Sequence, residues 1–469
     1  MFSAWAILGW LFPFTLDDWY WGTVHYVFPA PDNGRYAGHL VSLILTRSRT
    51  VRMLAVAAAM TGIVYCIERM VKRPAAFVIA SSSLLLLPKD VFRQAVAWAS
   101  GFSNYTAPVP LFLLFGLYIM EHPGGYNRRK AVPMLLLLLG FINSLFVEHY
   151  TVFNIALSVG LLVFYACKQT VRTDYIGYCA GSILGAMLMF SNSVYQKVLN
   201  HTDTYRAIAY GGFFRRIWEN YGKYIFRDGY LGNWFLNAVM LFSCLLLLRQ
   251  IPGEKPGRLQ KGVLGASLAG MYVFTALSVL SFLYYDYLNP FPKDDQIFWG
   301  ILSLLALLCT VAASLILAFA EGPDWFSVIL WAAFFALIAP LLIVYPIGGR
   351  CFLGSYVILI IIVCHLAGRI SLPSWGAKVK KYALVCSAVA ITVLFARYYY
   401  IFGWNYTVEI RRVEQARAEA EKGRKAVVIS RLPYEDYLWW GTPFNEGWNA
   451  HFKKFYGLPE DLVITVGKG

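Results

Sequence analysis

Long apolar runs separated by short polar segments recur along the whole chain. Many of these runs approach the ~20 apolar residues that a helix needs to cross a bilayer, and the shorter ones require local thinning of the membrane. The pattern therefore predicts an all-α polytopic membrane protein with about 13 transmembrane helices. These helices are expected near residues 2–16, 51–70, 75–88, 107–121, 131–146, 150–167, 175–190, 233–248, 262–284, 297–320, 325–345, 351–369 and 382–402.

The composition of the chain agrees with this prediction. Hydrophobic residues make up 58% of the 469 residues and charged residues 14%, whereas soluble domains average about 45–50% and about 25%. The eight cysteines are scattered through the apolar runs without a CxxC pair, which favours packing as small hydrophobic residues. Residues 2–16 lack a basic leader and a small-residue cleavage site, so we expect a first transmembrane helix there and not a cleavable signal peptide.

The basic residues indicate how the chain is oriented in the membrane. The net charge of +15 is dispersed among the apolar runs, which speaks against a nucleic-acid partner. When the N-terminus is placed in the cytoplasm, five of the six predicted inner loops are basic, as the positive-inside rule requires. Four longer segments then lie on the outer side of the membrane: 17–50, 89–106, 191–232 and 403–469.

The tail of the chain predicts a small structure of its own. It begins with a charged helix that ends at Gly423, and two short apolar runs at 426–430 and 462–466 are typical of strands. We therefore expect a transmembrane domain over residues 1–402 and a small extracytoplasmic α+β appendage over residues 403–469.

Two adjacent carboxylates, Asp17 and Asp18, stand where the first apolar run ends, among Trp19, Tyr20 and Trp21. Carboxylates at a membrane boundary are costly unless they bind a cation or accept hydrogen bonds. They can act as a general base or as oxygen ligands of a divalent cation. A solvated loop that merely ends a helix is the alternative, and aromatic residues are also typical of a membrane interface.

Two outer segments are predicted to lie at the membrane interface, 35–47 and 205–232. Arg35 and His39 are four residues apart and share one face of the first of these helices. An Arg at this depth can hold a phosphate, although anchoring to lipid headgroups explains it equally well.

A polar and aromatic loop is expected over residues 92–110, where Trp98, Asn104 and Tyr105 follow one another. Sugar rings are recognised by stacking on Trp and by hydrogen bonds from Asn, but a turn between two helices also explains this composition. Glu148 and His149 fall in a very short predicted outer turn, and an ionisable pair at membrane depth marks a candidate functional site.

Two further outer features complete the set. Arg350 follows Gly348 and Gly349, which let a ligand approach the backbone closely. The second acidic pair, Asp294 and Asp295, stands next to a lysine, which favours a solvated loop there. The chain has no Walker A, HExxH, GxSxG or Rossmann glycine motif, so nucleotide-driven chemistry is not expected.

Together these features resemble the GT-C superfamily of integral-membrane glycosyltransferases, over nearly the whole chain. The matching features, in order, are Asp17-Asp18, Gly34-Arg35-Tyr36 with His39, Trp98 with Ser100-Gly101, Asn104-Tyr105, Glu148, Pro346-x-Gly348-x-Arg350, and the ending over residues 452–461. The resemblance implies a multi-pass protein of the bacterial cytoplasmic membrane with its active site facing the periplasm or exterior. It also implies a polyprenyl-phosphate-linked sugar as donor and a cell-envelope glycan or lipid as acceptor.

In a direct displacement at the anomeric carbon, these residues take the following roles. One of Asp17 and Asp18 takes the proton of the acceptor hydroxyl, and cations stabilise the departing lipid phosphate. We assign the phosphate to Arg35, Arg206 and Arg350. A divalent cation, Mg²⁺ or Mn²⁺, held between Asp18 and Glu148 is a further possibility. The residues assigned to sugar or acceptor binding are Tyr20, His39, Trp98, Asn104, Tyr105, Glu148 and His149.

Two other functions compete with this one. A polysaccharide polymerase of the O-antigen type also uses polyprenyl-linked sugars on the outer side, but moves a preassembled glycan. A flippase or another transporter of lipid-linked glycans would carry charged residues in the middle of its spans. Here the charges concentrate at the outer ends, and runs such as 131–146 and 297–320 are nearly free of them.

Overall fold

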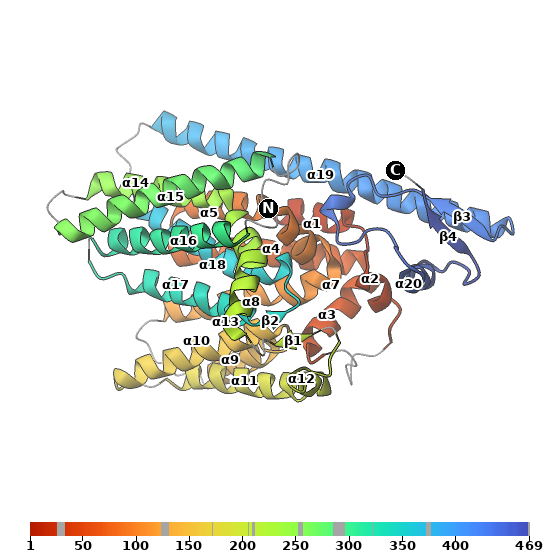
Figure 1. Ribbon diagram of the computed structural model, residues 1–469, viewed down its shortest axis with the longest axis horizontal. Coiled ribbons are helices and arrows are strands. Elements are labelled where there is room, and N and C mark those ends of the chain that lie inside the picture. Colours follow the sequence, from red (N-terminus) through yellow and green to blue (C-terminus); the bar gives the residue numbers. More distant parts are fainter. Residues whose placement is uncertain are drawn as a thin grey trace.

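The computed structural model of the chain is a bundle of helices with one long helix that extends beyond it (Figure 1). It describes residues 1–25, 33–122, 131–170, 172–204, 206–208, 212–251, 257–284, 296–320, 322–371 and 377–467. The acidic pair Asp294-Asp295 lies outside the described residues.

The elements follow one another in the order of the chain. In the first half, the α-helices are α1 (Phe2–Leu11), α2 (Asp17–Trp21), α3 (Tyr36–Arg47), α4 (Arg49–Val71), α5 (Pro74–Leu85), α6 (Lys89–Val91), α7 (Ala99–Gly101), α8 (Pro108–Glu121), α9 (Ala131–Asn143), α10 (Glu148–Cys167), α11 (Thr173–Phe190), α12 (Ser193–Leu199) and α13 (Phe213–Asn220). In the second half they are α14 (Trp234–Gln250), α15 (Arg258–Tyr284), α16 (Gln296–Phe319), α17 (Trp325–Ile338), α18 (Leu353–Gly368), α19 (Ala377–Glu421) and α20 (Glu446–Tyr456). Three π-helical stretches and three 3₁₀ turns connect them: η1 (Phe92–Ala97), η2 (Phe102–Thr106), η3 (Tyr221–Leu231), η5 (Ala339–Leu342), η6 (Gly349–Phe352) and η7 (Glu435–Tyr437). The strands are β1 (Ala207–Ile208), β2 (Val344–Tyr345), β3 (Ala426–Ile429) and β4 (Val463–Val466).

The apolar helices identify a membrane-embedded protein. Among the described residues, eight helical segments are long and apolar enough to cross a membrane, and ten if each of two bent pairs is one crossing. Each of the 13 predicted segments contains a helix, but α1 and α9 are shorter than a bilayer requires. The number of 13 crossings therefore stays a prediction.

The segment 92–110, which we predicted to be a loop, is helical except at Trp98 and Ala107. After α5 the chain turns by 80° into α6 and η1, and after Trp98 it begins an apolar helix that runs from Ala99 to Glu121. Trp98 itself is extended, with φ −82° and ψ 119°. The polar residues around Asn104 thus belong to the first turns of a membrane helix, because their neighbours are apolar enough to continue it inward.

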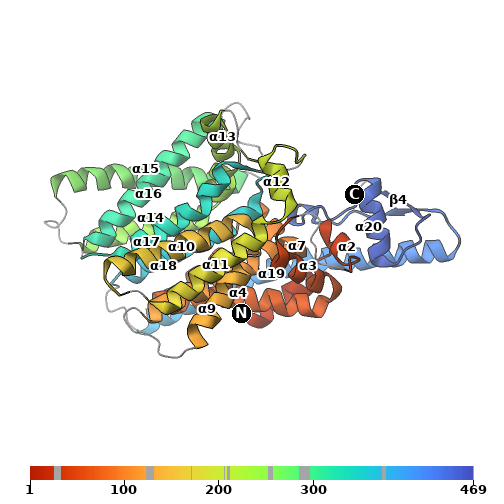
Figure 2. The same cartoon turned by 90° about the horizontal axis from the view of Figure 1, so that it is seen from below.

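Helix α18 forms the centre of the bundle, and 83% of an 18-residue apolar stretch within Gly349–Gly368 is buried. Its sequence, LGSYVILIIIVCHLAG, is apolar on all sides, as expected for a helix enclosed by others. It packs against α4, α5, α14 and α17, and α14 and α17 can be followed beside it in Figure 2.

Helices α9 and α11 pack unusually closely along a stripe of glycines. Gly177, Gly181 and Gly185 recur every four residues on α11. A Cβ atom at Gly181 would lie 2.0 Å from the carbonyl oxygen of Leu137, and one at Gly177 would lie 2.3 Å from that of Pro133. Small residues at this spacing let two helix backbones approach each other in a membrane.

The tail contains the predicted charged helix and both predicted strands. β3 and β4 are parallel, with Val427 opposite Ile464. Helix α19 runs unbroken through residues 402 and 403, where we placed the domain boundary, and carries the tail away from the bundle (Figure 1). The tail returns to the bundle at α2, where Trp19 packs edge-on against Phe452 with ring centroids 5.2 Å apart.

Candidate functional site

The turn at Leu16 sends the two adjacent carboxylates in different directions. Leu16 has φ 46° and ψ −114°, a conformation that costs energy for a branched side chain and that is typical of functional sites. Asp17 is half-buried and lines a large cavity, whereas Asp18 is fully buried behind it. Asp17 is therefore the carboxylate of the pair that a ligand in the cavity can reach.

Asp18 is held by hydrogen bonds to both of its oxygens. Oδ1 accepts from the backbone N (2.8 Å) and from Oγ (2.6 Å) of Ser100, and Oδ2 accepts from the backbone N of Thr15 (3.1 Å) and of Ala99 (3.4 Å). Ala99 and Ser100 begin a helix, where backbone N–H groups lack partners and favour a negative charge. Burial raises the pKa of Asp18 to about 6, while the hydrogen bonds from Ser100 and Thr15 act in the opposite direction.

Neighbouring elements fix the backbone that precedes this turn. Arg52 of α4 donates to the carbonyl oxygens of Phe12 and Pro13. Glu409 of α19 accepts from the backbone N of Phe14 at 3.0 Å and from the hydroxyl of Tyr456 at 2.5 Å. The direction of the turn is thus set jointly by a transmembrane helix and by the tail.

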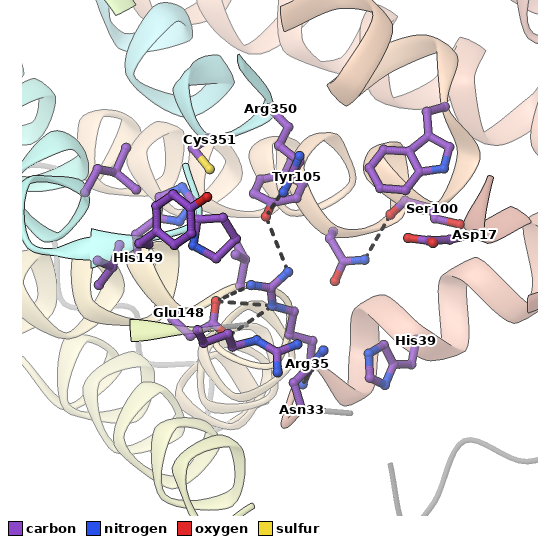
Figure 3. A pocket seen from close by; sticks show the side chains of 18 of the residues that line it. Asp17, Asn33, Arg35, His39, Ser100, Tyr105, Glu148, His149, Arg350 and Cys351 are labelled. Atoms are coloured by element: carbon purple, nitrogen blue, oxygen red, sulfur yellow. Dashed lines mark hydrogen bonds and ion pairs between the residues drawn. The ribbon is translucent and has the colours of Figure 1, made fainter. Parts of the chain in front are cut away.

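Arg35, directly before α3, forms an ion pair with Glu148, and both residues line the cavity (Figure 3). Its Nη2 lies 2.7 Å from Oε2, and its Nε donates to Oε1 at 3.0 Å. Tyr195 also donates to Glu148, at 2.8 Å. Glu148 and His149 form the first turn of α10, and not the turn between helices that we predicted, because the helix begins directly after Val147.

Tyr105 connects two arginines. Its hydroxyl oxygen accepts from Nη1 of Arg35 at 3.3 Å and from Nε of Arg350 at 3.2 Å. Arg350 also donates to Oε1 of Gln94 at 3.0 Å, and its guanidinium lies 5.9 Å from the ring centres of Trp98 and Trp439. Two guanidinium groups are therefore kept close together in an aromatic setting, which favours an anion between them.

Arg206 reaches the same cavity through a two-residue strand. β1 follows Arg206 directly and pairs with β2, so that Ala207 lies opposite Tyr345. Arg206 lines the cavity and forms an ion pair with Asp203, with Nη1 3.9 Å from Oδ2. The charged side chains that line the cavity are thus three arginines and two carboxylates, which leaves an excess of positive charge.

The cavity has a volume of about 880 Å³ and is mostly apolar. Eleven of the twelve predicted site residues line it: Asp17, Tyr20, Arg35, His39, Trp98, Asn104, Tyr105, Glu148, His149, Arg206 and Arg350. Asp18 is the exception. The structure thus brings together residues from five separate parts of the chain, 17–39, 98–105, 148–149, 206 and 350. Their roles stay predictions.

Four buried polar atoms of residues that line the cavity have no hydrogen-bond partner among the described residues. They are Nε1 of Trp98, Oδ1 of Asn104, Nδ1 of His39 and Nε2 of His149. Burial and the nearby Arg35 lower the pKa of His39 to about 3, so its ring is neutral at physiological pH and can either donate or accept a hydrogen bond. Buried polar groups are normally paired, which makes these atoms suited to a polar ligand.

Several residues of the site could not be found in the sequence. Tyr195, which lines the cavity, and Gln94, which accepts a hydrogen bond from Arg350, gave no signal, since each is a single polar residue in an amphipathic segment. The segment 437–448, YLWWGTPFNEGW, is rich in aromatic residues and could have been noticed. It supplies four residues to the cavity wall: Trp439, Trp440, Phe444 and Trp448.

A cation held by Asp18 and Glu148 is not favoured by their contacts. The oxygens of Asp18 accept from the Ser100 and Thr15 donors, and those of Glu148 from Arg35 and Tyr195. No group of three or more His, Cys, Asp or Glu side chains suited to a metal occurs within the described ranges. The cation stays a prediction, and we derive no step through it.

Comparisons of the chain with protein-family models, with curated proteins and with solved structures found no match.

Proposed function

We propose that the protein is a membrane glycosyltransferase of the GT-C type. It moves a sugar from a polyprenyl-phosphate donor to a cell-envelope glycan or lipid acceptor, on the outer side of a bacterial cytoplasmic membrane. The observation that carries the proposal is that one cavity holds a reachable carboxylate, Asp17, together with two arginines joined at Tyr105. A carboxylate and a cationic pocket are what a displacement with a phosphate leaving group requires.

In the proposed reaction the acceptor hydroxyl attacks the anomeric carbon of the donor sugar. Asp17 takes the proton of that hydroxyl as the new glycosidic bond forms. The bond between the anomeric carbon and the phosphate oxygen breaks, and the polyprenyl phosphate leaves as an anion. Arg350, Arg35 and Arg206 compensate its charge, and the single displacement inverts the anomeric centre.

The proposed topology has about 13 crossings, with the N-terminus in the cytoplasm and the tail outside. It is supported by the basic residues of the inner loops. In this orientation Asp17, Arg35, Glu148 and Arg350 all lie at outer helix ends, where a lipid phosphate in the outer leaflet has its headgroup.

A donor panel tests the proposal. Purified protein in nanodiscs is incubated with undecaprenyl-phosphate sugars and an envelope lipid extract, with and without EDTA. We expect one sugar to be added per turnover, and sensitivity to EDTA would indicate a cation. Addition of preassembled blocks would instead indicate a polymerase. No transfer, together with movement of labelled lipid-linked glycan across vesicles, would make the protein a transporter.

A further inference from the structure

Aromatic rings of the tail and of the first outer segment form a continuous series that ends in the cavity. Neighbouring ring centroids are 4.8 Å apart for Trp440 and Phe444, 6.4 Å for Phe444 and Trp448, and 5.5 Å for Trp448 and His451. Two further pairs continue the series. The ring centroids of His451 and Tyr20 are 5.4 Å apart, and those of Tyr20 and Trp21 are also 5.4 Å apart. We call these six residues the aromatic track: Trp440, Phe444, Trp448, His451, Tyr20 and Trp21.

The track runs from an exposed end to a buried end. Trp440 is 50% exposed and Phe444 is 52% exposed, whereas Trp21 is only 8% exposed and lies 4.6 Å from the ring of the buried His39. Trp440 has φ 53°, a conformation that a bulky side chain rarely adopts. The backbone therefore bears a cost at the position that presents the outermost ring, as is common in binding sites.

We propose that the aromatic track binds an extended oligosaccharide and guides its end to Asp17. This inference rests on the proposed function for the identity of that chain as the acceptor. Each pyranose unit offers an apolar C–H face that packs on an aromatic ring, and the spacing of the rings is comparable with the length of one unit. A growing glycan, rather than a small soluble acceptor, therefore fits the protein.

The surroundings of the track favour a glycan over a bilayer. All six residues line the cavity, whereas the aromatic residues of an interface belt face lipid. Polar side chains that can bind hydroxyl groups accompany the rings: Asn445 and Glu446 are exposed beside Phe444, and the buried Oδ1 of Asn449 has no hydrogen-bond partner among the described residues.

Binding of glycans of different length tests the proposal without any turnover. Full-length protein in nanodiscs is titrated in a calorimeter with gluco-oligosaccharides and with oligomers of N-acetylglucosamine, from one unit to about six. We expect the affinity for one of the two series to rise with chain length. Trp440→Ala and Trp448→Ala should each lower the affinity for the longest oligomer about tenfold and leave the monosaccharide unaffected.

Trp404→Ala is the matched control, because Trp404 is 48% exposed on α19 and does not line the cavity. It should bind all oligomers as the wild type does. Length-independent binding, or equal losses in all three variants, would overturn the proposal. So would quenching of the Trp440 and Trp448 fluorescence by brominated lipids, since the track would then contact the bilayer.

The same variants separate this inference from the proposed function. If the protein binds longer oligosaccharides more tightly but transfers no sugar, glycan binding by the aromatic track is supported and the proposed transferase activity is refuted. If Trp440→Ala and Trp448→Ala transfer sugar to long glycans with an unchanged KM, the transferase activity is supported and glycan binding by the aromatic track is refuted.

Discussion

At the scale of single residues, the site depends on a difference between two neighbouring carboxylates. Asp17 borders the cavity, and Asp18 is buried against Ser100 and Thr15. Asp17 is the proposed base, whereas Asp18 is a positioning residue that ties the turn to the helix beginning at Ala99. The conformation of Leu16 separates the two roles.

The burial of Asp18 predicts a pH dependence of stability. Its pKa of about 6 in the folded protein lies above the ordinary value of 3.8. Between about pH 4 and pH 6, Asp18 therefore keeps its proton in the folded state but has lost it in the unfolded state. The free energy of unfolding should fall by about 3 kcal/mol as the pH rises through this window, and level off above it.

Denaturant unfolding in detergent micelles, at several pH values from about 4 to 7, measures this slope. Asp18→Asn should remove it, and Asp461→Asn, at an exposed position of the tail, should retain it. The same slope in wild type and Asp18→Asn would show that Asp18 is not the group that titrates.

Tyr105 predicts a selective effect on the donor. Tyr105→Phe removes the oxygen that accepts from Arg35 and Arg350 but keeps the buried ring. We expect the KM for the proposed polyprenyl-phosphate donor to rise about tenfold, since two charge-assisted hydrogen bonds that orient the arginines are lost. Steady-state kinetics with varied donor measure it, and an unchanged KM together with an unchanged kcat would exclude this role.

The residues that sequence reasoning could locate are those that stand out against their surroundings. Charges at helix ends, such as Asp17, Arg35, Glu148 and Arg350, are visible because the flanking runs are apolar. The sequence did not show which of Asp17 and Asp18 lines the cavity, because this depends on the backbone conformation at Leu16. The aromatic residues of the tail were not assigned to the site because about 400 residues of chain separate them from α2, and only the fold brings them together.

At the scale of elements, the short α9 is held by its contact with α11. The glycines at 177, 181 and 185 on α11 allow the close approach. On α9, Gly140 lies against the backbone of α11, and a Cβ atom there would be 2.4 Å from the carbonyl oxygen of Tyr178. Helix α10 connects these two helices along the chain, and its first turn carries Glu148. Packing far from the cavity thus determines where Glu148 meets Arg35.

A single methyl group on this stripe should be destabilising. Gly181→Ala places a Cβ 2.0 Å from the carbonyl oxygen of Leu137, so the helices must separate. We expect a loss of about 1–3 kcal/mol in the free energy of unfolding. Gly160→Ala on α10 is the control, because a Cβ there meets nothing within 4 Å. Equal stability of the two variants would contradict the close packing.

The elements were predictable where length and apolarity decide them. The helix at 35–47 and the strands at 426–430 and 462–466 are confirmed as α3, β3 and β4, while the interfacial position of α3 stays a prediction. The segment 92–110 was wrongly predicted to be a loop, because its polar residues and its glycine are typical of turns. Its helical turns are buried against α3 and η6, and this tertiary packing overrides the local composition.

At the scale of the whole molecule, the account requires the cavity to open on the outer side. The positive-inside pattern places Cys167, the exposed last residue of α10, in the cytoplasm, and α20 outside. Single-cysteine variants test this arrangement in intact cells. A membrane-impermeant thiol reagent should label Ala450→Cys directly, and Cys167 only after permeabilisation. The reverse pattern would place Asp17 in the cytoplasm.

The central claim is that Asp17 takes a proton during sugar transfer inside the cavity. The most direct test is the rate at which purified protein releases polyprenyl phosphate from its donor when an acceptor is present, for wild type, Asp17→Asn and Asp461→Asn. The account predicts a fall of about 10²–10⁴-fold in Asp17→Asn, with an unchanged melting temperature, and a wild-type rate in Asp461→Asn. A wild-type rate in Asp17→Asn would contradict it.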